Sequence, residues 1–319
     1  MTQNKEYIPL KYRPRRFIER YGSRFLAWLV RILPRNAALK LADGLAFLVW
    51  HILPKHSRLA QRMIHQAFGD RYTPLERKQI ARRAYRNLVR AMVDFLRFPR
   101  LSKEELLGLC IDVEGWENIE KALEQSPGAV IGLAGHVGNW EYCGAYLPAR
   151  GIPLAAVGRE QRETAVTDLI IQARSAVGIE HIPRSKQGNR RLVGCFKRKG
   201  SVVGLLADQN AGKAGIFVPV FGRLASAFRG PAHFALHYNL PVVPIFAVWV
   251  GVKYKMIILE PVEIVRHEDM EEAVRLTTTN LQKVYEQIIS LYPDQYLWAH
   301  NRWKTRPPGE EGKKETGEA

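Results

Sequence analysis

The amino-acid sequence predicts an α/β fold in which a mixed central sheet is flanked by helices and preceded by an amphipathic, membrane-associated helical region. Three observations predict this fold. From residue 106 onward, short apolar runs alternate with longer stretches of helical periodicity. Polar residues follow within two positions of the end of three of the apolar runs. Nearly all of the net charge of +17 lies in the first third of the 319 residues.

Apolar residues at helical spacing predict the N-terminal helices. The first apolar face consists of Phe25, Trp28, Leu29 and Ile32. Arg24, Arg31 and Arg35 fall together on another face, which is typical of a helix lying in a membrane interface. A second stretch repeats the pattern with Leu41, Leu45, Leu48, Val49 and Ile52, and with Trp50 as an interfacial aromatic residue.

Attachment to one membrane face is favoured over a transmembrane helix. Spanning requires about 20 mainly apolar residues, and residues 44–53 are too few, while charged residues and a proline interrupt any longer window. A single poorly hydrophobic span is one alternative. A soluble helical subdomain with a solvated basic face is another.

The charge distribution narrows the choice of partner. Residues 1–100 contain 22 Lys and Arg against six acidic residues, a net charge of +16, and the remainder carries +1. A basic segment can bind nucleic acid, anionic lipid or an acidic protein. Platforms for single-stranded nucleic acid interleave aromatic and basic residues on a sheet. The aromatic residues here follow helical spacing instead, which favours anionic lipid and predicts no nucleic acid partner.

A third basic helix is predicted over residues 76–97. Its apolar side consists of Ile80, Ala84, Leu88 and Phe95, and its basic side of Arg82, Arg83, Arg86 and Arg90. Arginine clusters bind phosphate oxygens through paired hydrogen bonds. They also steer acidic proteins into place. Charges exposed on a helix surface without a specific partner are the commoner case.

The remaining chain predicts an alternating set of strands and helices. The predicted strands are 130–134, 154–158, 202–207, 242–248 and 255–260, and the predicted helices are 162–177, 187–199, 231–239 and Met270–Leu291. The domain organisation expected is a basic membrane-associated region over 1–105, a catalytic domain over 106–306 and a disordered tail over 307–319.

The most informative motif contains His136, just after the predicted strand 130–134, and Glu141 five residues later. Imidazole titrates at about pH 6.5 and can take and return a proton. A carboxylate at one ring nitrogen fixes the tautomer and leaves the other nitrogen free as a base. Glu141 is the expected partner, with Gly135 and Gly138 permitting close approach and Asn139 capping the following helix. A histidine that only packs at a strand end is the alternative.

Two further polar residues follow strands. Arg159 and Asp208 come after 154–158 and 202–207, as His136 comes after 130–134. Sites in α/β folds lie at the carboxyl ends of strands, so the coincidence favours a catalytic interpretation. Asp208 could instead cap a turn, and Arg159 could pair with a neighbouring glutamate.

The sequence predicts neither a metal site nor a cofactor. The zinc spacing His-Glu-x-x-His and paired Cys-x-x-Cys motifs are absent. Cys110, Cys143 and Cys195 are widely spaced and suggest no disulfide framework, which indicates a reducing, cytosol-facing site. The polar N-terminus predicts no cleavable signal peptide.

Residues 135–141 resemble the His-x4-Asp/Glu signature of lysophospholipid-type acyltransferases, in the Asn-Trp-Glu form of the late acyltransferases of lipid A biosynthesis. Further blocks follow in order over 158–159, 206–210, 215–222, 230–232, 241–244 and 298–304. The resemblance covers residues 25–307. Val220 is a departure, because this branch often has Phe there, and the choice of acceptor or acyl chain could differ.

The resemblance implies that a glycolipid hydroxyl attacks the thioester of an acyl carrier protein, with His136 as general base and Glu141 orienting it. Direct transfer needs no nucleophile from the protein, so it does not require Cys143. The implied substrate-binding residues are Gly138, Asn139, Arg159, Asp208, Gln209, Phe217 and Pro219.

A lipid substrate also implies an apolar tunnel and a location. The loop 216–221 and the N-terminal aromatic residues are the expected tunnel lining. The implied location is the inner membrane, with the site facing the cytoplasm. Acyl-CoA as donor, another glycolipid or a lysophospholipid as acceptor, and a basic membrane-binding protein without catalysis remain the alternatives.

Overall fold

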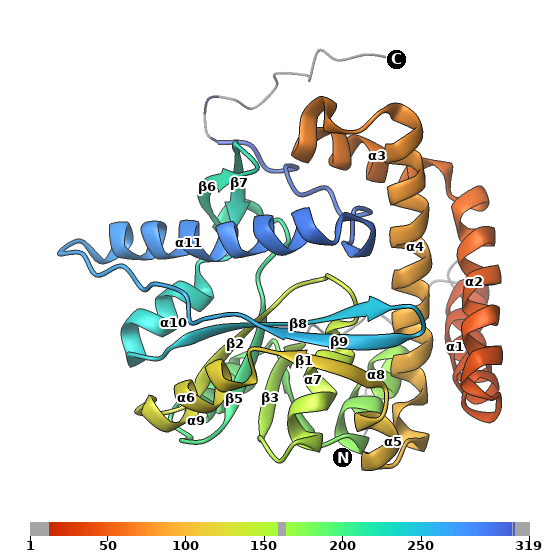
Figure 1. Ribbon diagram of the computed structural model, residues 1–319, viewed down its shortest axis with the longest axis horizontal. Coiled ribbons are helices and arrows are strands. Elements are labelled where there is room, and N and C mark those ends of the chain that lie inside the picture. Colours follow the sequence, from red (N-terminus) through yellow and green to blue (C-terminus); the bar gives the residue numbers. More distant parts are fainter. Residues whose placement is uncertain (1–12, 159–163, 308, 310–319) are drawn as a thin grey trace.

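The computed structural model describes residues 13–158, 164–307 and 309 (Figure 1). Arg159 and most of the expected tail lie outside these residues.

A seven-stranded sheet forms the centre of the molecule, in the order β1-β9-β8-β2-β5-β3-β4. The strands are β1 (Cys110–Glu114), β2 (Val130–Ala134), β3 (Leu154–Gly158), β4 (Ile179–Pro183), β5 (Val202–Leu206), β8 (Val242–Val250) and β9 (Lys253–Ile258). Every pairing is parallel except that of β8 with β9. The predicted mixed sheet is confirmed, and all five predicted strands are present.

The two edge strands, β1 and β4, were not predicted. Their sequences, Cys-Ile-Asp-Val-Glu and Ile-Glu-His-Ile-Pro, carry polar residues and lack the continuous apolar run of a strand buried on both faces. An edge position explains this composition, because one side of such a strand has no neighbour to bury it.

Helices cover both faces of the sheet. One face carries α6 (Trp116–Gln125), α7 (Trp140–Ala149) and α8 (Thr164–Ala176), and the other carries α9 (Lys186–Phe196), α10 (Gly230–Tyr238) and α11 (Met270–Leu291). Figure 1 shows α7 and α8 below the sheet and α11 above it. Successive residues alternate between the two cores, since Val130 faces the first and Ile131 the second.

The segment expected to be a loop lining a tunnel is a β-hairpin of β6 (Ile216–Val220) and β7 (Arg223–Ala227). Phe221 and Gly222 form its turn at φ values of 49° and 71°. Val218 and Val220 are buried, and the hairpin packs on α11. Alternation places Phe217 and Pro219 on the opposite face of the strand from these valines.

In the described part of the chain, the α-helices before the sheet are α1 (Arg13–Ile32), α2 (Arg35–Ile52), α3 (Pro54–Phe68), α4 (Pro74–Arg97) and α5 (Lys103–Leu107). A capping box between Thr73 and Glu76 starts α4, the longest of them. Ile80 and Ala84 contribute to one core and Phe95 to the other, so α4 joins both. Figure 1 shows α1 and α2 on its outer side.

Two predicted features of the N-terminal helices differ in the structure. Trp50 is buried rather than interfacial, because it packs edge-on against Tyr85 with ring centroids 5.5 Å apart. Arg31 and Arg35 face inward, where Arg31 donates to the Leu96 carbonyl and Arg35 pairs with Asp94. These two arginines therefore tie α1 and α2 to α4.

The apolar face of α1 is exposed as predicted, with Phe25 60% and Trp28 55% accessible. At the end of α2, Phe47, Leu48 and Ile52 are also exposed. Within the described residues no single helix combines the length and apolar character of a membrane span. α2 taken with residues 54–71 does, but the pair is bent by 93° at the break.

Candidate active site

The loop that carries His136 depends on its two glycines. A Cβ on Gly135 would lie 2.8 Å from the Tyr285 ring, and one on Gly138 would lie 2.0 Å from the Ala247 carbonyl oxygen. Gly138 also has a φ of 62°. Both glycines therefore permit close approach of protein groups, whereas we expected them to admit substrate.

Asn139 caps α7, as predicted. Its Oδ1 accepts the Tyr142 N–H at 3.0 Å, and its Nδ2 donates to the Tyr254 hydroxyl at 2.8 Å. Tyr254 donates in turn to Asp94 at 2.6 Å. The Asn139 side chain is fully buried in this network, so it positions the loop rather than facing a substrate.

The C-terminal segment holds the loop from the other side. The backbone N–H of Leu297 donates to the His136 carbonyl at 3.0 Å, and that of Gly138 donates to the Gln295 carbonyl at 2.9 Å. The terminal sequence block recognised over 298–304 thus begins directly beside the histidine.

Asp208 is the carboxylate at the histidine. Its Oδ1 lies 2.9 Å from His136 Nδ1, and its Oδ2 accepts the His136 backbone N–H at 2.9 Å. Asp208 is only 2% exposed. Strand register explains the contact, because Ala134 on β2 pairs with Leu206 on β5, and each polar residue follows two positions later.

The contact shifts the pKa of both His136 and Asp208. Burial disfavours the imidazolium, but the charge and hydrogen bond of Asp208, with a smaller contribution from Glu141, together outweigh burial and raise the pKa of His136 above its usual value. Burial likewise disfavours the Asp208 carboxylate, and the charge and hydrogen bonds of His136 outweigh it and lower the pKa of Asp208. Nδ1 therefore carries a proton, and Nε2 of the neutral ring is the free base.

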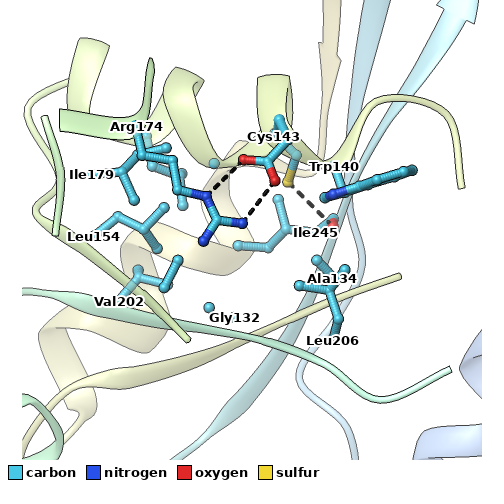
Figure 2. A pocket seen from close by; sticks show the side chains of 15 residues that line it. Gly132, Ala134, Trp140, Cys143, Leu154, Arg174, Ile179, Val202, Leu206 and Ile245 are labelled. Atoms are coloured by element: carbon cyan, nitrogen blue, oxygen red, sulfur yellow. Dashed lines mark hydrogen bonds and ion pairs between the residues drawn. The ribbon is translucent and has the colours of Figure 1, made fainter. Parts of the chain in front are cut away.

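We expected Glu141 to lie at the imidazole, and the structure shows that it does not. Its carboxylate receives two hydrogen bonds from Arg174 of α8, at 2.7 and 3.0 Å (Figure 2). Successive residues turn by about 100° around a helix. Trp140 meets the His136 ring, at 4.6 Å between centroids, and Glu141 points toward α8. Glu141 still contributes a lesser charge effect that raises the pKa of His136.

Gln209 lies at the other ring nitrogen. Its amide nitrogen is 3.4 Å from His136 Nε2. The loop that carries it is held on both sides, since Tyr296 donates to the Asp208 carbonyl and the Asn210 N–H donates to His300 Nε2. Asp208 and Gln209 thus bracket the imidazole from one short loop.

A narrow, mainly apolar pocket lies between the sheet and the helices α7 and α8, as Figure 2 shows. Trp140 belongs to both the pocket wall and the surroundings of His136. The Glu141–Arg174 pair forms the polar part of the wall. The lining consists of Gly132, Ala134, Trp140, Glu141, Cys143, Gly144, Leu147, Leu154, Ala156, Arg174, Ile179, Val202, Gly204, Leu206 and Ile245.

The structure brings together only some of the predicted residues. His136, Asp208 and Gln209 meet, and Glu141 lines the adjoining pocket. Phe217 and Pro219 lie on β6 and form no part of that lining. Arg174, which sequence reasoning missed, is a buried cation on a predicted helix, and only the fold shows that it faces Glu141.

The site offers base chemistry. Burial raises the pKa of Cys143 to about 12, so its thiol is not a ready nucleophile at neutral pH. Among the described residues, no cluster of three or more His, Cys, Asp or Glu side chains could hold a metal ion. An oriented, neutral imidazole is a base that can deprotonate a substrate hydroxyl directly.

Comparisons with known proteins agree with these observations. A model of the family "Bacterial lipid A biosynthesis acyltransferase" matches residues 11–305. The chain is 24% identical to the lipid A biosynthesis palmitoleoyltransferase of Escherichia coli K12, over 93% of this chain and 94% of that protein. It is 24% identical to the lauroyltransferase of the same organism, over 97% and 98%. A phosphatidylinositol mannoside acyltransferase of Mycobacterium tuberculosis is 29% identical over 41% and 42%.

The ion pair predicts a pH-dependent loss of stability in Asp208→Asn. The raised pKa of His136 stabilises the fold below about pH 6.5 and ceases to do so as the pH rises through the shifted value. The loss in unfolding free energy should therefore be larger at pH 5.5 than at pH 9, by about 1.4 kcal/mol for each pKa unit that the variant removes. Denaturant unfolding at both pH values measures this. An equal loss at both would show that no charge pair forms.

Proposed function

This chain belongs to the bacterial lipid A biosynthesis acyltransferase family, and we propose that it moves a fatty acyl chain from an acyl carrier protein thioester to a hydroxyl of a lipid A precursor. The observation that carries the mechanism is the His136–Asp208 pair, which leaves Nε2 as a free base on a partly exposed imidazole. The relatives that span nearly the whole chain are named for lipid A acylation, which supports this acceptor.

In the proposed reaction His136 Nε2 accepts the hydroxyl proton as the oxygen attacks the thioester carbon. The C–O bond forms, the C–S bond breaks, and the proton passes from Nε2 to the leaving thiolate. Asp208 keeps the proton of the imidazole on Nδ1 and stabilises the imidazolium that forms. This assigns to Asp208 the orienting role that the sequence motif suggested for Glu141.

The mainly apolar lining of the pocket suits the hydrocarbon part of a substrate. It begins at Trp140, beside the base, and runs along the sheet over Gly132 and Gly204, which are paired neighbours on β2 and β5. Gly204 leaves room for an added Cβ, whose nearest neighbour would be Leu154 Cδ1 at 3.5 Å, whereas Val202 already fills the space beside Gly132. We therefore propose that an acyl chain lies here and not against the hairpin residues Phe217 and Pro219.

Basic side chains support an acidic protein as donor. Arg58, Arg62, Arg82 and Arg86 are exposed on α3 and α4. An acyl carrier protein is acidic, and such a surface would steer it electrostatically. The phosphates of a lipid A precursor could bind the same cations. Acyl-CoA is the alternative donor.

We propose that the protein lies at the inner membrane with its site facing the cytoplasm, and that the N-terminal helices attach it there. Phe25 and Trp28 are exposed on α1, and Phe47 and Ile52 at the end of α2. Apolar and aromatic side chains beside basic ones are typical of helices that bind anionic lipid surfaces.

A second candidate acceptor is a different glycolipid. The mycobacterial relative is named for acylation of a phosphatidylinositol mannoside, and its match covers less than half of this chain. The same base and pocket would serve that acceptor, so only an assay with both glycolipids distinguishes the two.

The function is tested with purified protein in detergent, acyl carrier protein thioesters and a tetra-acylated, sugar-decorated lipid A precursor. Wild type should add one acyl chain, detected by mass. His136→Ala should lose about 10²-fold or more in rate, as expected for removal of a positioned base. Asn189→Ala, on the exposed face of α9, is the control. Turnover undiminished in His136→Ala would contradict the mechanism. Transfer only from acyl-CoA or only to a mannoside would favour the alternatives.

The acyl pocket predicts a change in chain length. A Cβ on Gly204 would meet its nearest atom, Leu154 Cδ1, at 3.5 Å, so Gly204→Ala fits while occupying the pocket. The preferred acyl chain should become shorter in Gly204→Ala and shorter still in Gly204→Val. Each excluded methylene should lower kcat/KM for the longer chain about fourfold, from about 0.8 kcal/mol per buried methylene.

The control is Gly194→Ala on α9, where an added Cβ meets nothing within 4 Å. Competition between thioesters of graded length measures the profile, and thermal unfolding checks the fold. An unchanged profile in both Gly204 variants would place the acyl chain elsewhere.

Membrane binding is tested by flotation with vesicles of mixed neutral and anionic phospholipid. Replacing Phe25 and Trp28 together by Ser should lower the partition coefficient about 10²-fold or more, because each large apolar side chain contributes roughly 1.5 kcal/mol or more when buried. The matched control replaces Ile111 and Met270, which are also exposed but lie on β1 and α11. Equal loss in both double variants would contradict attachment through α1.

A further inference from the structure

We infer that the side-chain amide of Gln209 donates a hydrogen bond to the thioester carbonyl oxygen of the acyl donor as negative charge develops there. The inference rests on the proposed acyl transfer and names the group that would stabilise its oxyanion. The Gln209 amide nitrogen lies 3.4 Å from His136 Nε2.

The chemistry of the histidine fixes which end of the Gln209 amide faces it. Asp208 is an acceptor at Nδ1, so Nδ1 carries the ring proton and Nε2 presents a lone pair. Only the NH₂ group of Gln209 can bond to a lone pair. A hydrogen-bond donor therefore sits at the atom where the acceptor hydroxyl must bind.

Substrate binding then displaces the amide by a short distance. The incoming hydroxyl must lie about 2.6–3.2 Å from Nε2 to give up its proton. The attacked carbon is one bond beyond that oxygen, and the carbonyl oxygen one bond further. The Gln209 amide, already 3.4 Å from Nε2, reaches this region by rotating its side chain.

The backbone on either side of Gln209 is held by hydrogen bonds, so the side chain can rotate while the backbone stays in place. Ala207 accepts from Gln282 and its N–H is bonded to the Tyr285 hydroxyl, while the Asn210 N–H is bonded to His300. The backbone on both sides of Gln209 is thus held, and its side chain is only partly buried. A donor on a fixed backbone needs little reorganisation at the moment of reaction.

Three backbone amides of the histidine loop already donate hydrogen bonds within the protein. The N–H of His136 is bonded to Asp208, that of Gly138 to the Gln295 carbonyl, and that of Asn139 to the Ala247 carbonyl. Three of the loop amides closest to the base are therefore occupied by protein acceptors. The side-chain amide of Gln209 is the donor that the structure places at Nε2, 3.4 Å away.

The step is balanced without any further reactant. The acceptor oxygen bonds to the thioester carbon, and its proton moves to His136 Nε2. The carbonyl oxygen becomes an oxyanion that receives the Gln209 N–H. When the C–S bond breaks, the carbonyl re-forms and Nε2 returns the proton to the thiolate.

Two isosteric variants test the inference. Gln209→Met keeps the length of the side chain and removes the donor, and Gln209→Glu replaces the donor with an acceptor of negative charge. Both should lower kcat with KM little changed, Gln209→Met by about 10²-fold or more, the usual effect of losing one oxyanion donor. Gln125→Met and Gln125→Glu are matched controls at an exposed position on α6. A Gln209→Met enzyme as fast as wild type, or faster, would overturn the inference.

A binding measurement separates this inference from the proposed function. An acyl-phosphopantetheine analogue whose thioester is replaced by a fluorinated ketone forms a hydrate that resembles the tetrahedral intermediate. Wild type should bind it about 10²-fold more tightly than Gln209→Met does, and a thioether analogue that lacks the oxygen should bind both equally. Equal affinity for the hydrate would overturn the role of Gln209. If the affinities differ but wild type acylates no lipid A precursor, the acceptor assignment fails and the inference stands.

Discussion

The hydrogen-bonded contact between His136 and Asp208 is the interaction on which the rest of the site depends. Two neighbouring parallel strands end in register and deliver one polar residue each, so the sheet itself brings the pair together. The Tyr285 hydroxyl reinforces this arrangement, because it donates to the Ala134 carbonyl and accepts the Ala207 N–H. One tyrosine on α11 thus holds both strand ends just before the two residues.

Much of the catalytic domain could be predicted from the sequence because its central strands are continuous apolar runs. The same reasoning failed at β1 and β4, where edge positions tolerate polar residues. The wrong partner for the histidine has a different cause. Glu141 is close in sequence but lies on a helix, where one residue's rotation turns it toward Arg174. Asp208 is 72 residues away and becomes adjacent only through strand pairing.

The sequence shows that Asp208 follows a strand, but it does not show which strand pairs with that one. Strand order decides which carboxylate meets which imidazole, and strand order depends on long-range packing. The same limit applies to Arg174, whose partner could be found only after α7 and α8 were placed on one face of the sheet. It also applies to Trp50 and Arg35, which periodicity assigned to a membrane surface and packing turned inward.

The central claim is that Asp208, and not Glu141, sets the tautomer and charge of His136. Nitrogen-15 NMR of the imidazole, titrated in wild type, Asp208→Asn and Glu141→Gln, tests it most directly. The account predicts a proton on Nδ1 and a pKa above 6.5 in wild type, with a large fall of the pKa in Asp208→Asn and a smaller one in Glu141→Gln. A larger fall in Glu141→Gln than in Asp208→Asn would contradict it.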